Sequence, residues 1–271
     1  MRRTSTCCAV LALALLGLAS AASAAPTVKL KAVAVPIKGY PDTGNIAGAG
    51  AGLNVEYVIS GSEYGGFPPP VIGINFFLPP EAKIDSKGFV TCPEATITEK
   101  KEPEACPKGS AASPLDAGGH AEGKVDGVVS FGKTRVPEEA ELFAFFKPGG
   151  GLEFFTFGHS PTTLEIPSAG LYSQINGGGG FGPKFDAKVP LVETVPGAPY
   201  ASVEKINVNV GAAHGPKSPK KATYYGREPK KCPKGFELLK TEVIFAENGE
   251  ESKPEIATAE YKAPCPKGAK K

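Results

Sequence analysis

Clusters of glycine and proline divide this chain into short segments rich in β-branched and aromatic residues. Such segments are typical of β-strands, and the breakers between them are typical of turns. No segment shows the long 3.6-residue apolar period of a helix, and nothing indicates the strand–helix alternation of a parallel sheet. The expected strands are residues 27–35, 53–59, 71–78, 140–146, 152–157, 162–166, 184–192, 201–210, 238–246 and 255–261.

This pattern predicts an all-β fold, namely an antiparallel β-sandwich or jelly roll. With 41% hydrophobic residues the chain is too apolar to be disordered, and its length allows one large domain or two smaller ones. The frame V-x-x-I-N occurs at Val71 and at Val203, which an internal duplication into two lobes would explain. We place a boundary in the glycine-rich segment, with a first lobe at 25–175 and a second, β-rich lobe at 176–271 that could be continuous with the first.

The N-terminus has the three parts of a secretory signal peptide. Arg2 and Arg3 form a positive region, residues 9–19 an apolar region, and residues 22–24 a small-residue cleavage site. The apolar run is shorter than the roughly 20 residues of a membrane helix, and no second apolar span follows. We therefore expect residues 1–24 to be a signal peptide and the mature protein, without a transmembrane segment, to be extracellular or associated with the cell envelope.

Four cysteines remain beyond this segment, and each is followed by proline: Cys92, Cys106, Cys232 and Cys265. An even number of cysteines in an oxidising compartment favours structural disulfides. The wide gaps between them hold no CxxC pair for zinc binding or redox chemistry. Proline donates no ladder hydrogen bond, so each Cys-Pro is expected at the end of a strand.

A turn in the C-terminal segment predicts which cysteines pair. Asn248-Gly249 favours a two-residue hairpin turn, and in an unbulged hairpin around it Cys232 lies directly opposite Cys265. Opposed strand residues lie about 4.5–5.5 Å apart, within disulfide range. The remaining disulfide is then Cys92–Cys106.

Several cysteine-containing segments resemble those of a known family. The order "FFLPP…KGFVTCP…ACPKG", then "YYGREPKKCPKGF" and "YKAPCPK", is similar to a family of uncharacterised secreted bacterial β-rich proteins. The resemblance covers most of the mature chain and implies a secreted β-rich protein. That family has no known activity, so it implies no functional residue.

The chain offers no recognisable catalytic or metal-binding motif. "GHSPT" at Gly158 lacks the closing glycine of a nucleophile elbow, which leaves His159 and Ser160 as loop residues. His120, His159 and His214 have no metal-ligand spacing. We expect no catalytic residue, no metal and no cofactor.

Glutamates and phenylalanines gather around the "FKPGGG" turn. A glycosidase needs two carboxyl groups at a defined separation, and Glu138, Glu139, Glu141 and Glu153 are the candidates, with a solvated sheet face as the plainer interpretation. Six phenylalanines flank the same turn and could stack on sugars, but the chain has no tryptophan and core packing is the better interpretation. They are Phe143, Phe145, Phe146, Phe154, Phe155 and Phe157.

Lysines are the most distinctive surface feature of the second half. They are Lys217, Lys220, Lys221, Lys230, Lys231 and Lys234, joined by Lys267, Lys270 and Lys271 if Cys232 pairs with Cys265. Arg135 and Arg227 are the only arginines after the signal peptide, which argues against nucleic-acid recognition. The cluster fits an anionic cell-envelope polymer or another surface protein, and its plainer interpretation is a solubilising face.

We expect a secreted, non-catalytic protein with a structural or binding role outside the cell or in the cell envelope. The alternative is a carbohydrate-active jelly-roll enzyme, either a glycoside hydrolase or a lyase, or a carbohydrate-binding module.

Overall fold

The computed structural model describes residues 25–115, 123–175, 180–218 and 221–271. The expected signal peptide, His120, Lys220 and part of the glycine-rich segment lie outside these ranges. Thirteen of the described strands form one sheet, whose pairings are antiparallel, which confirms the all-β antiparallel prediction. The long strands do not separate into two sheets packed face to face, so a sandwich or jelly roll is not confirmed.

The strands of the large sheet are β1 (Thr27–Val35), β2 (Gly50–Ser60), β3 (Val71–Phe77), β4 (Lys83–Ile84), β5 (Gly123–Phe131), β6 (Thr134–Phe146), β7 (Leu152–Ser160), β8 (Leu164–Gln174), β9 (Pro183–Lys188), β10 (Ser202–Val210), β13 (Gly226–Arg227), β14 (Phe236–Ala246) and β15 (Pro254–Pro264). A separate small hairpin is made by β11 (Ala213–His214) and β12 (Thr223–Tyr224). Helix α1 (Glu94–Lys100) and the 3₁₀ turns η1 (Pro103–Ala105) and η2 (Glu247–Gly249) complete the described elements.

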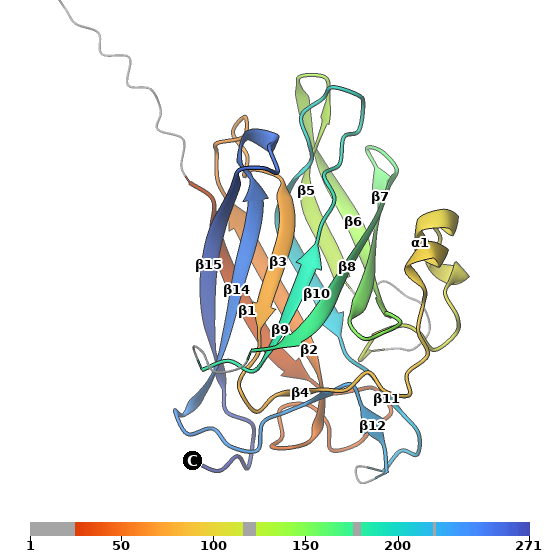
Figure 1. The fold of residues 1–271 in the computed structure, drawn as a ribbon, viewed down its shortest axis with the longest axis vertical. Helices are drawn as coiled ribbons and strands as arrows, with labels where there is room; N and C mark the ends of the chain where they lie inside the picture. Colours follow the sequence, from red (N-terminus) through yellow and green to blue (C-terminus); the bar gives the residue numbers. More distant parts are fainter. Residues whose placement is uncertain (1–24, 116–122, 176–179, 219–220) are drawn as a thin grey trace, which may run out of the picture.

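The large sheet curls round until its two ends meet. Its long strands are hydrogen-bonded in the order β15-β14-β3-β9-β8-β7-β6-β5-β10-β2, and β1 pairs with β2. β1 also packs beside β15, at the opposite end of this order. Figure 1 shows the red-orange β1 next to the dark blue hairpin of β14 and β15. The sheet therefore has an inner face that is shielded from water.

The two halves of the chain contribute alternately to this sheet. β14 pairs with β3, β9 lies between β3 and β8, and β10 lies between β5 and β2. Strands from the segment first assigned to a second lobe are thus inserted among strands of the first. The segments 25–175 and 176–271 share one continuous sheet.

The core follows from the two-residue alternation of the strands. In β14 the residues buried in alternation are Glu237, Leu239, Thr241, Val243 and Phe245, and Ala246 at the end of the strand is buried as well. The same alternation buries Val55, Tyr57 and Ile59 of β2. The apolar side chains among them belong to one hydrophobic cluster, whereas Glu237 is a charged residue at a buried position.

The hairpin of β6 and β7 is buried on both faces. Leu142, Ala144 and Phe146 face the inner core, whereas Phe143, Phe145 and Phe155 form a second cluster on the outer face. The segment 92–111, which contains α1, covers this outer cluster with Cys92, Ile97 and Ala111 (Figure 1). The phenylalanines of this hairpin therefore serve core packing, as the plainer interpretation held.

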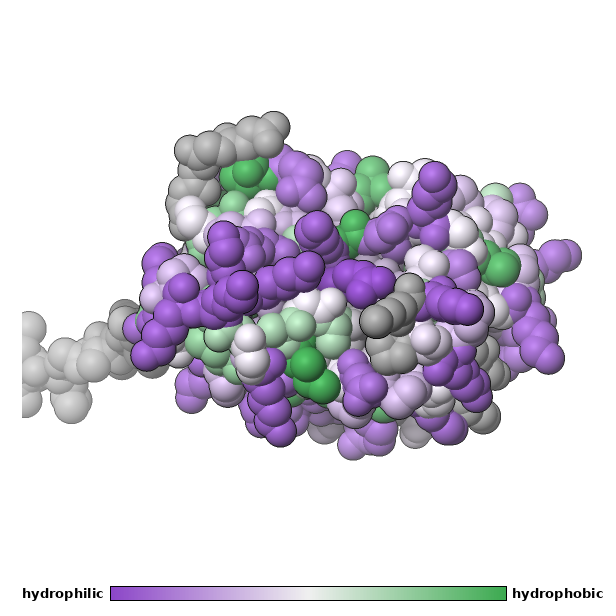
Figure 2. Space-filling model, turned by 90° about the horizontal axis from the view of Figure 1, so that it is seen from below, coloured by the Kyte–Doolittle hydropathy of each residue, from purple (hydrophilic) through white to green (hydrophobic). Residues whose placement is uncertain are grey.

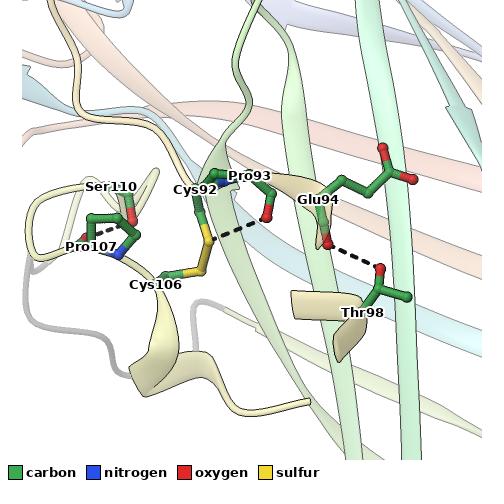
Figure 3. Close-up of a disulfide and its surroundings, with 7 residues drawn as sticks. All are labelled: Cys92, Pro93, Glu94, Thr98, Cys106, Pro107 and Ser110. Atoms are coloured by element: carbon green, nitrogen blue, oxygen red, sulfur yellow. Dashed lines mark hydrogen bonds between the residues drawn. A yellow bond between two sulfur atoms is a disulfide. The ribbon is translucent and has the colours of Figure 1, made fainter. Parts of the chain in front are cut away.

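A disulfide closes this covering segment at its base. Cys92 and Cys106 are bonded, with 5.2 Å between their Cα atoms. Figure 3 shows this bond, which joins the residue Cys92 just before α1 to Cys106, which directly follows η1. Around it, Thr98 Oγ1 donates to the carbonyl of Glu94 at 2.9 Å and Ser110 Oγ donates to that of Pro107 at 2.7 Å. The backbone of Cys92 also donates to the carbonyl of Phe146 at 2.8 Å, which fixes the segment to the end of β6.

The second expected disulfide, Cys232–Cys265, is also present, but the strand register behind its prediction is wrong. Ala246 faces Pro254 and Phe236 faces Pro264, so paired numbers add to 500 and Cys232 has no strand partner. Asn248 and Gly249 do adopt positive φ, of 52° and 82°. However, they lie inside a connection of residues 247–253, where Glu247 N donates to the carbonyl of Lys253. The bond forms beyond the ends of both strands.

None of the helices among the described residues is long and apolar enough to span a membrane.

Candidate functional site

The inner face of the curled sheet surrounds a cavity of about 310 Å³. Protein interiors normally contain few voids larger than a water molecule, whereas small-molecule sites begin at about 300 Å³. The walls are mainly apolar, with Ile74, Phe76, Leu142, Phe154, Ile166 and Val208 among them. The cavity is therefore the described feature best suited to hold a ligand.

Small side chains at inward-facing positions leave this space open. Ala32 and Ala34 of β1, Ser168 of β8 and Ala187 of β9 line the cavity where larger residues would fill it. Ala187 faces Gly170 across the β8–β9 pair, so neither of these neighbouring strands has a large side chain at this position. The cavity therefore results from the small residues that the sequence places in its wall.

Aromatic rings contribute to the cavity wall. The ring of Tyr172 lies 4.8 Å from that of Phe185 and 6.1 Å from that of Tyr225. Burial raises the pKa of Tyr172 to about 12 and also raises that of Tyr225. Both hydroxyls therefore stay neutral at physiological pH and add hydrogen-bonding groups to an otherwise apolar wall.

Two acidic side chains and one amide side chain line the cavity near β13 and the start of β14. Glu237 occupies the first inward-facing position of β14 and is only 8% exposed. Glu228 follows β13, and its backbone continues the sheet through a hydrogen bond from Glu228 N to the carbonyl of Ala49 at 3.0 Å. Asn45 comes from the loop before β2, and all three side chains line the cavity. We call them the acceptor end.

Burial makes the carboxyl groups of the acceptor end unusually weak acids. Burial, together with a smaller contribution from the nearby charge of Glu237, raises the pKa of Glu228 to about 7. Burial also raises the pKa of Glu237, with a contribution from Glu81. The acceptor end can therefore gain or lose a proton near neutral pH.

Sequence reasoning missed this site, although the pattern of β14 contains a sign of it. The alternation L-x-T-x-V-x-F of β14, extended two residues toward the N-terminus, puts a glutamate in phase with core residues. A charged residue in phase with a buried face is unusual without a partner. Glu228 has no comparable signal, because it lies outside any long strand.

The predicted lysines lie at the same end of the molecule. The backbones of Lys231 and Lys270 form an isolated β-bridge, and Lys270 N donates to the carbonyl of Lys230 at 3.0 Å. The C-terminal tail therefore runs beside the segment that precedes β14. Lys217 and Lys221 belong to the connection between β11 and β12. Figure 2 views this end and shows hydrophilic residues over most of it, with paler apolar residues between them. We call this the basic face; it also carries the exposed Lys234, Lys267 and Lys271.

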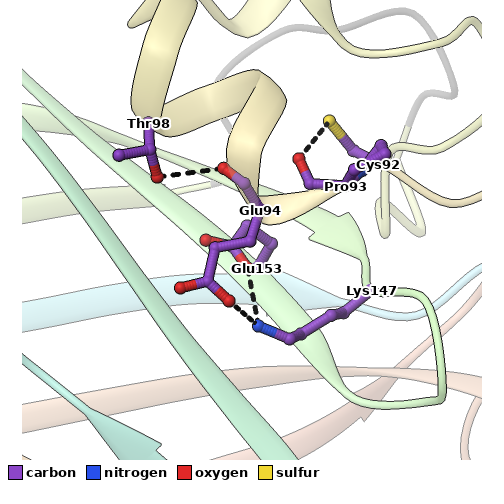
Figure 4. Close-up of polar contacts among 6 residues, drawn as sticks. All are labelled: Cys92, Pro93, Glu94, Thr98, Lys147 and Glu153. Atoms are coloured by element: carbon purple, nitrogen blue, oxygen red, sulfur yellow. Dashed lines mark hydrogen bonds and ion pairs between the residues drawn. The ribbon is translucent and has the colours of Figure 1, made fainter.

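The carboxylates near the "FKPGGG" turn do not converge in a groove. Glu153 faces Phe145, seven residues along β6 from Glu138, which separates the two by about 23 Å along the strand. Glu153 is 0% exposed and lies under α1 with Lys147 (Figure 4). Glycosidase carboxyls lie only about 5–10 Å apart and must reach a substrate.

The other two candidates of that group are surface residues. Glu141 Oε2 lies 3.3 Å from His159 Nε2, and both side chains are largely exposed. Glu139 faces Ser160, the last residue of β7. Within the described ranges, no group of three or more histidine, cysteine, aspartate or glutamate residues is arranged to hold a metal ion.

Comparisons with protein-family models, with curated proteins and with solved structures found no match to this chain. The family resemblance of the cysteine-containing segments therefore stays a prediction, and the function is argued from the cavity itself.

Proposed function

We propose that this protein is a non-catalytic binding protein that acts outside the cytoplasm and holds the apolar part of a small ligand inside its curled sheet. The observation that carries this proposal is the cavity of about 310 Å³ with apolar walls and a polar end. The two disulfides fit an oxidising compartment, as does the signal peptide expected at residues 1–24.

The size of the cavity supports occupancy. The cavity of about 310 Å³ reaches the lower limit of small-molecule sites, and its lining is mainly apolar. An apolar ligand that binds the folded state and not the unfolded chain would stabilise the fold by mass action.

A paired substitution tests the proposal. Ala187 faces the cavity, while Ala169, on the neighbouring strand, is absent from the cavity wall and alternates with the inward-facing Ser168 and Gly170. Ala187→Leu should fill the space and lower the binding of an apolar fluorescent probe, 1-N-phenylnaphthylamine, at least fivefold. Ala169→Leu, which adds the same volume outside, should leave the binding unchanged. Wild-type protein that does not bind the probe, or equal binding by both variants, would contradict the proposal.

A second, independent role is supported by the basic face. The hydrogen bonds between the C-terminal tail and the segment Lys230–Cys232 hold lysines from two distant parts of the chain together. We propose that this face contributes to association with an anionic envelope polymer through salt-sensitive attraction. Reversal of Lys230, Lys231, Lys267 and Lys270 to Glu should abolish retention by teichoic or polyuronic acid resin, and 0.5 M salt should do the same to the wild type. Retention that is unchanged by both the charge reversal and the added salt would contradict this role.

A further inference from the structure

The acceptor end contains hydrogen-bond acceptors that the protein does not satisfy. Glu237 Oε1 and Asn45 Oδ1 are both buried, and neither oxygen has a hydrogen-bond partner. Glu237 is more than nine-tenths buried, and both side chains line the cavity. Buried acceptors are nearly always paired, so these two oxygens indicate a missing donor.

Two basic residues line the cavity, Lys83 of β4 and Arg227 of β13, and Lys83 is exposed to solvent. Arg227 lines the cavity, but its guanidinium lies 4.7 Å from the centre of the Tyr224 ring and donates to the carbonyl of Ala222. Lys231 lies 3.8 Å from a carboxylate oxygen of Glu81 on the surface. No ion pair among the described residues involves Glu228 or Glu237, and Glu237 lies close enough to raise the pKa of Glu228.

We propose that the ligand is a cationic amphiphile whose protonated amine occupies the acceptor end while its apolar chain fills the cavity. An ammonium group carries three N–H donors and no acceptor, and the acceptor end offers Glu237, Asn45 and Glu228. The negative potential of two carboxyl groups in a poorly hydrated site selects a cation over a neutral or anionic head group. Among the described parts of the cavity wall, this end is the one that carries acidic residues.

This inference rests on the proposed apolar-ligand function, and a set of three ligands separates the two. Decylamine, decanol and decanoic acid share one apolar chain and differ in the head group. Their binding to the mature protein can be measured by calorimetry and by displacement of 1-N-phenylnaphthylamine at pH 8. We expect decylamine to bind at least tenfold more tightly than decanol, and decanoic acid to bind most weakly.

Three isosteric substitutions test whether the acceptor end causes the preference for decylamine. Glu237→Gln keeps the shape but removes the charge, and it should lower decylamine affinity about tenfold while changing decanol affinity less than twofold. Glu228→Gln should act in the same direction. Glu260→Gln removes an exposed carboxylate from β15 and should change neither.

The outcomes are distinct. Decanoic acid binding as tightly as decylamine, or an amine preference that survives both Glu237→Gln and Glu228→Gln, would overturn the inference and leave the apolar-ligand function standing. If none of the three ligands binds, both the function and the inference are wrong.

Discussion

Lys147 Nζ lies 3.4 Å from Oε2 of Glu153, a carboxylate with no exposed surface. The same ammonium group also pairs with Glu94 at the start of α1, as Figure 4 shows. Burial lowers the pKa of Lys147, but the two carboxylates outweigh it and the net change is upward. Burial raises the pKa of Glu153, whereas Lys147 lowers it. Lys147 therefore joins the covering segment, through Glu94, to the buried carboxylate of the hairpin beneath it.

Removing one member of this pair should be costly. Lys147→Met leaves a buried carboxylate without a partner, and such losses typically cost about 3–5 kcal/mol of unfolding free energy. The double variant Lys147→Met/Glu153→Leu should recover most of that loss, because no charge remains buried. Urea denaturation of the three proteins measures the effect. A single variant as stable as the wild type would show that the pair contributes nothing.

The Cys92–Cys106 disulfide should stabilise the covering segment. It closes a loop of 15 residues, for which the loop-entropy model gives about 3 kcal/mol. Cys92→Ser/Cys106→Ser should lower the midpoint of thermal unfolding and increase amide exchange in α1 and at the outer phenylalanine cluster. Peptide mapping without reduction should recover Cys92 linked to Cys106 and Cys232 linked to Cys265. Exchange that is unchanged in α1 would refute this role of the bond.

Stability should depend on pH through Glu228. The pKa of this carboxyl is about 7 in the folded protein, against its ordinary value of 4.5, so the folded state binds the proton more tightly. The penalty for ionising it is therefore full above pH 7 and disappears as the pH falls toward 4.5. Glu228→Gln should raise the unfolding free energy by roughly 2–3 kcal/mol at pH 8 and change it little at pH 4.5. The difference between wild type and variant, measured across this range, isolates Glu228 from other carboxyl groups; a constant difference would disprove the assignment.

Arg135 of β6 connects the end of β5, the segment that leads into β10 and the loop that follows β2. Its guanidinium donates to Ser130 Oγ and Ser202 Oγ, both at 2.8 Å, and to the carbonyl of Tyr200 at 3.0 Å, and it packs over the Tyr64 ring. Lysine lacks the planar fork that makes these bonds, so Arg135→Lys should cost roughly 2 kcal/mol. Lys133→Ala, an exposed change in the adjacent turn, serves as the control in chemical denaturation. Equal effects of the two substitutions would count against this role.

The long strands could be predicted from the sequence because each combines β-branched residues with clear breakers. β5 was missed, since "GKVDGVVSF" contains two glycines and two charged residues that weaken the pattern. Its glycines are required by the fold: a Cβ on Gly123 would lie 2.0 Å from the carbonyl oxygen of Asn207 in β10. Such close approach between strands depends on tertiary packing and leaves no local signal.

Neither the closure of the sheet nor the position of the site could be predicted from the sequence, because both depend on tertiary contacts. Strand order depends on contacts between residues far apart in the chain, such as those of β14 with β3. The pairing of Cys232 with Cys265 was predicted correctly from a register that is three residues off, because both cysteines lie near the open end of the hairpin. The acceptor end combines a loop, a strand end and the residue after a two-residue strand, and the sequence alone does not bring these together.

The meeting of β1 with the β14–β15 hairpin has a consequence for how the protein is made. The wall of the cavity remains incomplete until the last strand has been synthesised, because β15 packs against the first strand of the chain. Folding therefore depends on contacts that span almost the whole described sequence, and topologies dominated by such contacts fold slowly. Until the seam between β1 and β15 closes, the apolar inner surface stays exposed, and a ligand that meets the chain in this interval would be enclosed as the seam closes.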